Sequence, residues 1–289
     1  MKNPLDIRRK VADTTLSLPV MGMGTAPLGE LYGLVDEAVS AATLNAAWDA
    51  GIRFFDTAPW YGRGLAEHRL GGFLRTKPRD AFVVTTKVGR TLHRPADPNA
   101  FDRGPWSGGL NFDVKFDYSY DGVMRSYEQA LQRIALDTVD ALVIHDLDSV
   151  YHDDEMIAAH SKDLNETGMR ALQELKSTGH IKAFGMGINT KEQLAGLAQQ
   201  VDLDFVLVAM PYTLLDQSAL PTMSWLRGQG TSVIIGAPYA SGILVTGPVP
   251  GARYAYAPAT DEVMDKARRI EAVCREHGVA LAAAALRFC

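Results

Sequence analysis

The stretch "GIRFFDTAPWYG", residues 51–62, decides how this chain is expected to fold. Its first part, Ile52–Phe55, is apolar and aromatic, which is typical of a buried strand. The run ends in Asp56, and Trp60 and Tyr61 follow after three small or rigid residues. A carboxylate and a phenol placed directly after a buried strand point to a functional loop rather than to core packing.

Similar apolar runs alternate with helix-like segments along the whole chain, which favours parallel strands joined by crossover helices. The predicted strands are Leu18–Gly24, Ile52–Asp56, Ala81–Lys87, Asp140–His145, Ile181–Asn189, Asp204–Met210 and Ser232–Pro238. The predicted helices are Asp36–Ala50, Leu65–Arg75, Tyr120–Leu136, Asn165–Ser177, Lys191–Gln200 and Asp216–Arg227. We therefore expect the α/β class, as a parallel (β/α)₈ TIM barrel in one domain over residues 1–289.

An open doubly wound sheet is the competing architecture, and it usually carries a glycine-rich nucleotide loop after its first strand. The sequence "GMGTAPLG" has Gly22 and Gly24 but places Pro27 where the third glycine belongs. No Walker-type loop is present in the sequence. The barrel is therefore preferred.

Bulk composition points to an ordinary enzyme-sized protein. The 289 residues are 47% hydrophobic, and the net charge is -5 with dispersed basic residues, so nucleic acids and anionic membranes are not expected partners. The cysteines Cys274 and Cys289 cannot build a disulfide framework. The first fifteen residues lack an apolar signal-peptide core and no long apolar run follows, so a cytoplasmic location is expected.

Two connections exceed the usual loop length. They are residues 89–117, rich in Gly, Pro and Asn, and residues 146–163, which are acidic. Long loops after barrel strands are commonly lids or binding loops, so we expect both to be such loops.

Polar residues end several of the predicted strands. Asp56, Lys87, His145 and Asn189 take these positions, and Tyr61 follows Asp56 by five residues. Because the carboxyl ends of parallel barrel strands share one rim, these side chains are expected to converge.

The residue types complement one another chemically. A tyrosine with a pKa near 10 exchanges protons poorly at neutral pH, and an adjacent ammonium lowers that pKa. We expect Lys87 to lower the pKa of Tyr61 by roughly three units, about 4 kcal/mol. Asp56 would keep Lys87 charged, and His145 would orient the reacting oxygen.

On these residues the chain resembles the aldo-keto reductase superfamily along essentially its whole length. "GIRFFDTAPWYG" is similar to that family's Asp-Thr-Ala-x-x-Tyr-Gly signature. The resemblance implies a catalytic tetrad of Asp56, Tyr61, Lys87 and His145, with Tyr61 as the proton donor or acceptor. It also implies a barrel that binds NAD or NADP without a Rossmann domain.

The resemblance extends to the cofactor segments. It implies that Gly24, Thr25 and Asp56 lie near the nicotinamide ribose and that Asn189 binds the carboxamide. The sequence "YASGILVTG" resembles the loop that covers the pyrophosphate in relatives. The residues carried over from that loop are Ser241, Gly242 and Leu244.

The chain also departs from the family pattern. No glutamine stands in "DFVLVAMPY", and Gly236 takes the place of an aromatic residue that stacks on the nicotinamide in many relatives. The sequence ends at "ALAAAALRFC", within a helix that precedes the eighth strand in relatives. We expect the barrel to lack its eighth strand and last helix here, and the natural polypeptide to continue for roughly forty residues.

Within the superfamily, the signature region and "VDALVIHDLD" look most like the bacterial aldose 1-dehydrogenases. The resemblance implies oxidation of the C1 hemiacetal hydroxyl of an aldose such as L-fucose to a lactone. Trp60 and Trp106 are candidates for stacking on the sugar, or for loop packing. Pyridoxal 4-dehydrogenase and an NADPH-dependent carbonyl reductase are the alternatives, and the oligomeric state stays open.

Two other functional classes are weighed against this one. The sequence "HDLDSVYHDDE" groups His145, Asp146, Asp148, His152 and Asp153, which is compatible with a metal-dependent hydrolase. It has no metal-binding His-x-His spacing, so we expect no metal site. A non-catalytic cofactor-binding module on the same fold is the other alternative.

Overall fold

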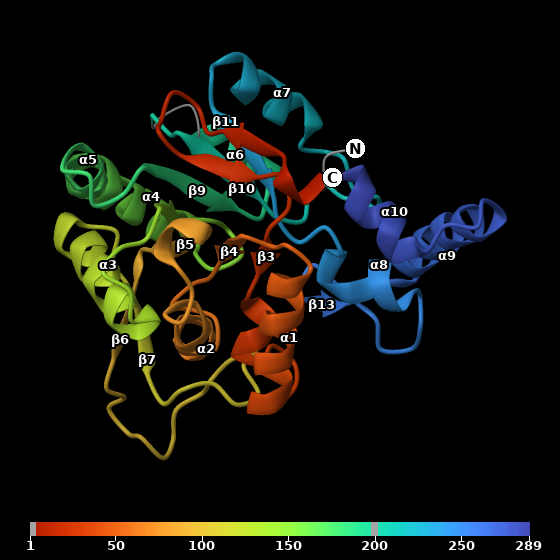
Figure 1. Ribbon diagram of the computed structural model, residues 1–289, viewed down its shortest axis with the longest axis horizontal. Coiled ribbons are helices and arrows are strands. Elements are labelled where there is room, and N and C mark those ends of the chain that lie inside the picture. The colour runs from red at the N-terminus through yellow and green to blue at the C-terminus, as the bar shows by residue number, and fades with distance from the viewer. Residues whose placement is uncertain (1–3, 198–201) are drawn as a thin grey trace. The chain divides into compact units, whose positions relative to one another are not determined.

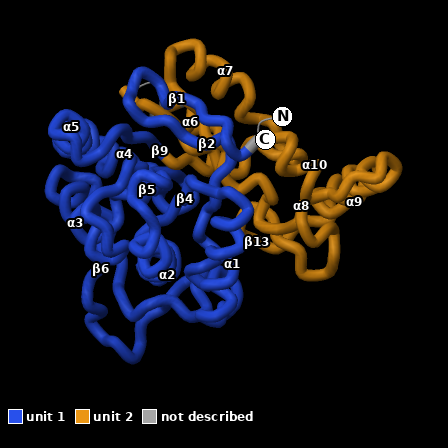
Figure 2. The backbone as a smooth tube through the Cα atoms, viewed as in Figure 1, with its two compact units in different colours: residues 1–186 blue, residues 187–289 orange. Residues whose placement is uncertain are grey.

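The computed structural model describes residues 4–197 and 202–289. Two compact units divide the chain, residues 1–186 and residues 187–289 (Figure 2). Each unit is described by itself below. The prediction of one domain over residues 1–289 stays a prediction.

A parallel sheet forms the centre of the first unit, with strand order β9-β8-β5-β4-β3. Every residue of β5, β8 and β9 is buried, as expected for parallel strands covered on both faces. The strands are β3 (Met23–Gly24), β4 (Phe54–Asp56), β5 (Val83–Val88), β8 (Ala141–Ile144) and β9 (Ala183–Ile188).

The strand register places the predicted functional positions side by side. Gly24 pairs with Asp56, and Asp56 pairs with Thr85, two residues before Lys87 on β5. Residues that end neighbouring parallel strands therefore share one edge of this sheet.

The main helices of the first unit lie close to the residue ranges predicted for them. In α3, Val123, Tyr127, Ala130 and Ile134 recur at helical spacing and are buried, and α3 packs against β5 and α2 (Figure 1). Ser119 caps α3 by accepting a hydrogen bond from the backbone of Gly122. The helices are α1 (Glu37–Asp49), α2 (Leu65–Leu74), α3 (Tyr120–Ile134), α4 (Asp154–Asp163), a π-helical turn (Leu164–Gly168) and α5 (Met169–Ser177).

The structure corrects three expectations for this unit. The connection 89–117 is not one irregular loop, because its ends pair as an antiparallel hairpin of β6 (Arg90–His93) and β7 (Asp113–Phe116). The acidic connection 146–163 contains α4, whose first turn Asp153 caps from its side chain. The first predicted strand is split: β2 (Ser17–Pro19) pairs with β1 (Arg8–Lys10), and β3 alone joins the parallel sheet.

The second unit contains the last two residues of β9 and a parallel pair of strands, β10 (Phe205–Val208) and β11 (Ser232–Ile235). The backbone N–H of Ala209 donates to the carbonyl of Ile188 at 2.9 Å. The apolar core of the second unit includes Leu215, Ile243 and Leu244. The other elements are α6 (Lys191–Leu197), α7 (Leu220–Gly228), α8 (Ile243–Thr246), β12 (Arg253–Tyr254), β13 (Ala257–Pro258), α9 (Asp261–Glu276) and α10 (Leu281–Phe288).

Short 3-10 turns complete the described elements. They are Pro4–Asp6, Ala26–Gly29, Arg79–Ala81 and Ala240–Gly242. The end of the predicted helix Lys191–Gln200, residues 198–200, lies outside the described residues. None of the helices within the described ranges combines the length and the apolar character needed to cross a membrane.

Within residues 4–197 and 202–289, seven parallel strands alternate with helices: β3, β4, β5, β8, β9, β10 and β11. This is the alternation of a (β/α)₈ barrel, and it confirms the predicted fold class.

Candidate active site

A buried ion pair links the ends of β4 and β5. The Lys87 ammonium donates to the Asp56 carboxylate at 2.5 Å and to the backbone carbonyl of Thr57 at 2.8 Å. The Thr85 hydroxyl donates to the other Asp56 oxygen at 2.7 Å. The side chain of Lys87 is 2% exposed, so its charge is balanced almost entirely by Asp56.

Tyr61 lies over this pair. The Lys87 nitrogen is 5.0 Å from the centre of the Tyr61 ring, and the ring of His145 is 5.9 Å from it, edge to face. The structure thus brings Asp56, Tyr61, Lys87 and His145 together, as expected for side chains that follow neighbouring parallel strands.

Two glycines hold the backbone behind Tyr61. A Cβ atom on Gly29 would lie 2.5 Å from the carbonyl carbon of Tyr61 and from the backbone nitrogen of Gly62. Gly62 has a φ of +62°, and a Cβ atom there would lie 2.6 Å from the carbonyl oxygen of Gly29. The position of Tyr61 is therefore fixed by a main-chain contact that no larger residue permits.

The expected effect of Lys87 on the phenol is wrong for this structure. The pKa of Tyr61 is raised well above its ordinary value, first by burial and then by the negative charges of Asp56 and Asp146. Because Lys87 is paired with Asp56 at 2.5 Å, the phenol meets a nearly neutral pair rather than a free ammonium. Tyr61 is consequently a protonated phenol in the resting protein.

His145 follows β8 and is 4% exposed. Its pKa is lowered well below the ordinary value by burial and by the positive charges of Arg90 and Lys87. The imidazole is therefore neutral at physiological pH.

Arg90 and Asp146 contact His145, and the sequence reasoning missed their part in the site. Arg90 lies on β6, three residues after Lys87, and its guanidinium donates to Asp146 at 2.7 Å. Asp146 directly follows His145, and its sequence context suggests only a possible metal ligand. One feature of the sequence points to Arg90: it is a second cationic residue only three positions after Lys87, which ends the predicted strand.

An aromatic wall adjoins the tetrad. Trp60 packs edge-on against Trp106 with ring centres 5.5 Å apart, and against Tyr151 at 6.3 Å. The Trp106 ring is 6.0 Å from that of Tyr61. Trp106 is 3% exposed, and its buried indole N–H has no hydrogen-bond partner in the part of the chain that the structure describes. Trp60 is half-buried, so of the two tryptophans it offers the more accessible face.

The two cofactor residues predicted on the first strand differ from each other. Gly24 is exposed, and no atom lies within 4 Å of where its Cβ would be. Thr25 is fully buried, and its backbone N–H and its hydroxyl both donate to the carbonyl of Asp56, at 2.9 and 3.0 Å. Thr25 thus holds the Asp56 backbone in place, and its predicted cofactor contact stays a prediction.

The other predicted cofactor residues belong to the second unit. Asn189 directly follows β9 and is half-buried. Ser241 and Gly242 both have positive φ, +59° and +105°, in the turn before α8. Leu244 is fully buried in the apolar core, and its N–H donates to the carbonyl of Tyr239. Its predicted cofactor contact stays a prediction.

The acidic connection has no arrangement typical of a metal centre. Within the described ranges, no group of three or more His, Cys, Asp and Glu side chains is placed to hold a metal ion. Asp153 caps α4, Asp146 pairs with Arg90, and His152 packs against Phe116 with ring centres 4.3 Å apart.

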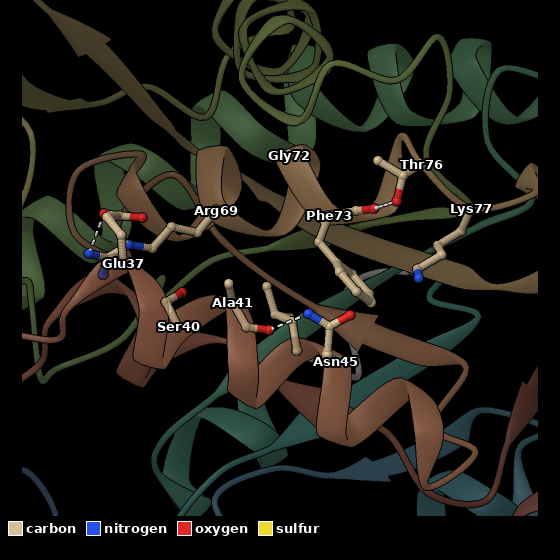
Figure 3. Close-up of a pocket in the computed structure, with 10 residues that line it drawn as sticks. Glu37, Ser40, Ala41, Asn45, Arg69, Gly72, Phe73, Thr76 and Lys77 are labelled. Atoms are coloured by element: carbon tan, nitrogen blue, oxygen red, sulfur yellow. Dashed lines mark hydrogen bonds and ion pairs between the residues drawn. The ribbon is translucent and has the colours of Figure 1, made fainter.

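A cavity of about 320 Å³ lies elsewhere in the first unit, between α1 and α2 (Figure 3). Glu37 and Arg69 form an ion pair at one end of it, and Phe73 and Lys77 line the other. No residue of the tetrad lines this cavity, so it is separate from the candidate active site.

Comparisons with known proteins identify the family of the chain. The profile of the Aldo/keto reductase family matches residues 20–289. The chain is 41% identical to pyridoxal 4-dehydrogenase from Microbacterium luteolum, over 97% of this chain and 84% of the relative. It is 38% identical to D-threo-aldose 1-dehydrogenase from a Pseudomonas species, over 94% of this chain and 82% of the relative.

A solved structure supports the fold. Glycerol dehydrogenase from Gluconobacter oxydans superposes with a TM-score of 0.71 at 21% identity, over 97% of this chain and 81% of that one. The sequence signature, the parallel β/α fold and the extent of both sequence matches lead to one conclusion: the chain belongs to the aldo/keto reductase family of oxidoreductases.

Proposed function

We propose that this protein oxidises the C1 hemiacetal hydroxyl of an aldose such as L-fucose to a lactone, with NAD or NADP as the oxidant. The observation that carries the proposal is the buried Lys87–Asp56 pair beneath the ring of Tyr61, with the neutral His145 at the ring edge. A phenol proton and a neutral imidazole at one edge of the sheet support the proposal that Tyr61 exchanges a proton and that His145 orients the reacting oxygen.

Tyr61 exchanges a proton with the reacting oxygen. Burial and Asp56 favour the protonated phenol at rest, so the oxidation direction requires the phenolate to be stabilised during turnover. When bound, the oxidised nicotinamide supplies the hydride acceptor and a positive charge that favours this phenolate. His145 orients the same oxygen by a hydrogen bond.

The residues at the end of β3 fit a nicotinamide cofactor. Gly24 presents bare backbone with open space above it, and it pairs in register with Asp56. A flat ring can approach such a surface closely because there is no side chain to exclude it. In the second unit, Asn189 is the proposed contact to the carboxamide. Ser241, Gly242 and Leu244 are the proposed contacts to the pyrophosphate.

The proposed substrate is a small polyol because aromatic faces and hydrogen-bond donors occur together beside Tyr61. Trp60 offers an aromatic face to the apolar side of a sugar, and the Trp106 indole N–H is a buried donor without a partner within the described ranges. Such a donor discriminates strongly for a ligand that supplies an acceptor oxygen.

Pyridoxal is the second candidate substrate. The 41% identity to a pyridoxal 4-dehydrogenase favours it, and its hemiacetal offers the same reacting atoms on a flat ring. The two candidates share one reaction, the oxidation of a cyclic hemiacetal to a lactone.

The test is a panel of L-fucose, D-arabinose and pyridoxal, each offered with NAD and with NADP, while reduced nicotinamide is followed by absorbance. Formation with a sugar supports the proposal and identifies the cofactor, whereas formation with pyridoxal alone replaces the substrate. No formation with any member, together with reduction of an aldehyde by NADPH, would overturn the oxidation proposal in favour of carbonyl reduction.

The variant Tyr61→Phe tests the mechanism. It removes the exchangeable proton and leaves the ring packing intact, so turnover should fall by on the order of 10²-fold or more while cofactor affinity is retained. Turnover equal to that of the natural protein would refute the role of Tyr61.

A further inference from the structure

Arg90 is a buried cation in direct contact with His145. Its side chain is 1% exposed, and the same guanidinium nitrogen, Nη1, lies 2.8 Å from His145 Nδ1 and 2.7 Å from an oxygen of Asp146. The other terminal nitrogen, Nη2, is buried and has no hydrogen-bond partner among the described residues. Arg90 is therefore held mainly by the pair it forms with His145 and Asp146.

These contacts determine where the imidazole proton lies. A guanidinium donates hydrogen bonds and never accepts them, so His145 Nδ1 must be the acceptor. The proton of the neutral ring then resides on Nε2, which lies 3.1 Å from the same Asp146 oxygen. The contact with the Arg90 guanidinium thus specifies a single tautomer.

The backbone supports this arrangement. Asp146 is 6% exposed and has a φ of +47°, in the left-handed region that non-glycine residues rarely adopt. Asp146 directly follows His145, and with this backbone conformation its carboxylate lies beside the imidazole ring of His145. Unfavourable backbone at such a position is typical of functional sites, where the surrounding structure enforces it.

Aromatic rings enclose the cation and hold its charge away from water. The guanidinium carbon lies 4.5 Å from the ring centre of Tyr151, 4.7 Å from that of Phe116 and 5.2 Å from that of Trp60. Arginine does not lose its proton in proteins, so this is a permanent positive charge beside His145.

We propose that Arg90 is a positioning residue that keeps His145 neutral with its proton on Nε2, so that an N–H donor is available to the oxygen of the substrate. This inference rests on the proposed function, because it assigns His145 to that oxygen. Arg90 acts through His145 and Asp146 and does not itself exchange a proton.

Several charged or titratable groups face His145. They are Arg90 on β6, Lys87 on β5, the adjacent Asp146, the phenol of Tyr61, and the Tyr118 hydroxyl, which donates to the His145 carbonyl at 2.7 Å. Loss of Arg90 removes one of the two cations and leaves Asp146 to pair with the ring. The imidazolium is then less disfavoured, so the pKa of His145 should rise from its lowered value while burial and Lys87 continue to lower it.

The direct test is the tautomer of His145 in the natural protein, read from the nitrogen chemical shifts of its ring, with His145→Asn used to assign the signal. We expect the Nε2–H form throughout the pH range in which the protein is folded. An Nδ1–H tautomer, or an imidazolium at neutral pH, would overturn the proposal. This readout requires no turnover, so it stands apart from the substrate panel.

The variants Arg90→Gln and Arg90→Lys test the consequence for catalysis. In Arg90→Gln, kcat should fall on the order of tenfold for each pH unit below the raised pKa of His145, with KM little changed. Arg90→Lys keeps the charge and should restore most of the natural pH profile. The matched control is Arg133→Gln, which removes another buried arginine, paired with Glu67, and should lower stability without changing the tautomer.

If Arg90→Gln keeps the natural pH profile and a neutral His145, the proposal is wrong. If Arg90→Gln does not fold, the tautomer of the natural protein and the profile of Arg90→Lys still decide. Failure of the aldose proposal alone would instead appear as a missing signal in the substrate panel with the His145 tautomer intact.

Discussion

Replacing Asp56 with asparagine tests how the charges beneath Tyr61 are balanced. Asparagine has nearly the same shape as aspartate, and its one amide oxygen can still accept from Lys87, while its NH2 group can donate to the Thr85 hydroxyl. The geometry around the ammonium is thus retained. The change removes the negative charge that raises the pKa of Tyr61 and leaves the Lys87 ammonium without its counter-ion.

The size of the effect follows from the position of Lys87. Its nitrogen lies 5.0 Å from the centre of the Tyr61 ring. At an effective dielectric constant near 20, a unit charge at that separation contributes about 3 kcal/mol. This corresponds to about 2 pKa units of stabilisation of the phenolate, so Asp56→Asn should lower the pKa of Tyr61 by up to that amount.

The assay is the pH dependence of kcat for substrate oxidation. Because the phenolate accepts the proton in this direction, the rate rises with pH as Tyr61 ionises, and in Asp56→Asn this rise should move to lower pH. An unchanged profile, or one moved to higher pH, would refute the reasoning that Asp56 masks a charged Lys87.

A matched control is available at the opposite end of the same sheet. Asp140 precedes β8, is 2% exposed, and accepts hydrogen bonds from Arg79 at 2.8 Å and Lys182 at 2.7 Å. Asp140→Asn removes a more deeply buried carboxylate at the other end of the strands from the tetrad. It should lower stability and leave the pH profile of oxidation unchanged.

Three further changes have defined outcomes. Glu67→Ala leaves Arg133 as a buried unpaired cation and should lower the free energy of unfolding by about 3–5 kcal/mol, measured in denaturant, and an unchanged midpoint would contradict this. Gly24→Val should fold normally but weaken cofactor binding by at least about tenfold in a calorimetric titration, whereas Gly33→Val, at an equally open glycine, should bind as before. Gly71→Ala would place its Cβ 2.1 Å from a carbonyl oxygen of α3, so it should cost about 1–3 kcal/mol of stability; a thermal midpoint equal to that of the natural protein would show that the two helices separate freely.

The sequence predicted the strands, the principal helices of the first unit and the convergence of Asp56, Tyr61, Lys87 and His145. These followed from local properties: apolar runs of strand length, helical spacing and polar residues at strand ends. The hairpin of β6 and β7 was missed because the pairing depends on residues twenty or more positions apart, and a connection rich in Gly, Pro and Asn resembles an irregular loop.

The electrostatics of the site could not be predicted in the same way. The sequence predicts an ammonium near Tyr61 but contains no distances. It therefore does not reveal the 2.5 Å contact through which Asp56 neutralises that ammonium. The position of Arg90 against His145 likewise depends on the hairpin pairing. The role of Thr25 could not be predicted from the sequence for the same reason. Its two hydrogen bonds to the Asp56 carbonyl form only when β3 and β4 lie side by side.

The main-chain contact between Gly29 and Gly62 has a consequence for engineering. Since the two backbones touch behind Tyr61, neither segment can be replaced without regard to the other. When chimaeras are made with relatives, the loop after β3 and the loop after β4 must be exchanged together as one block. A mutant library intended to change the substrate should therefore hold both glycines constant and place its diversity on Trp60, Trp106 and Tyr151.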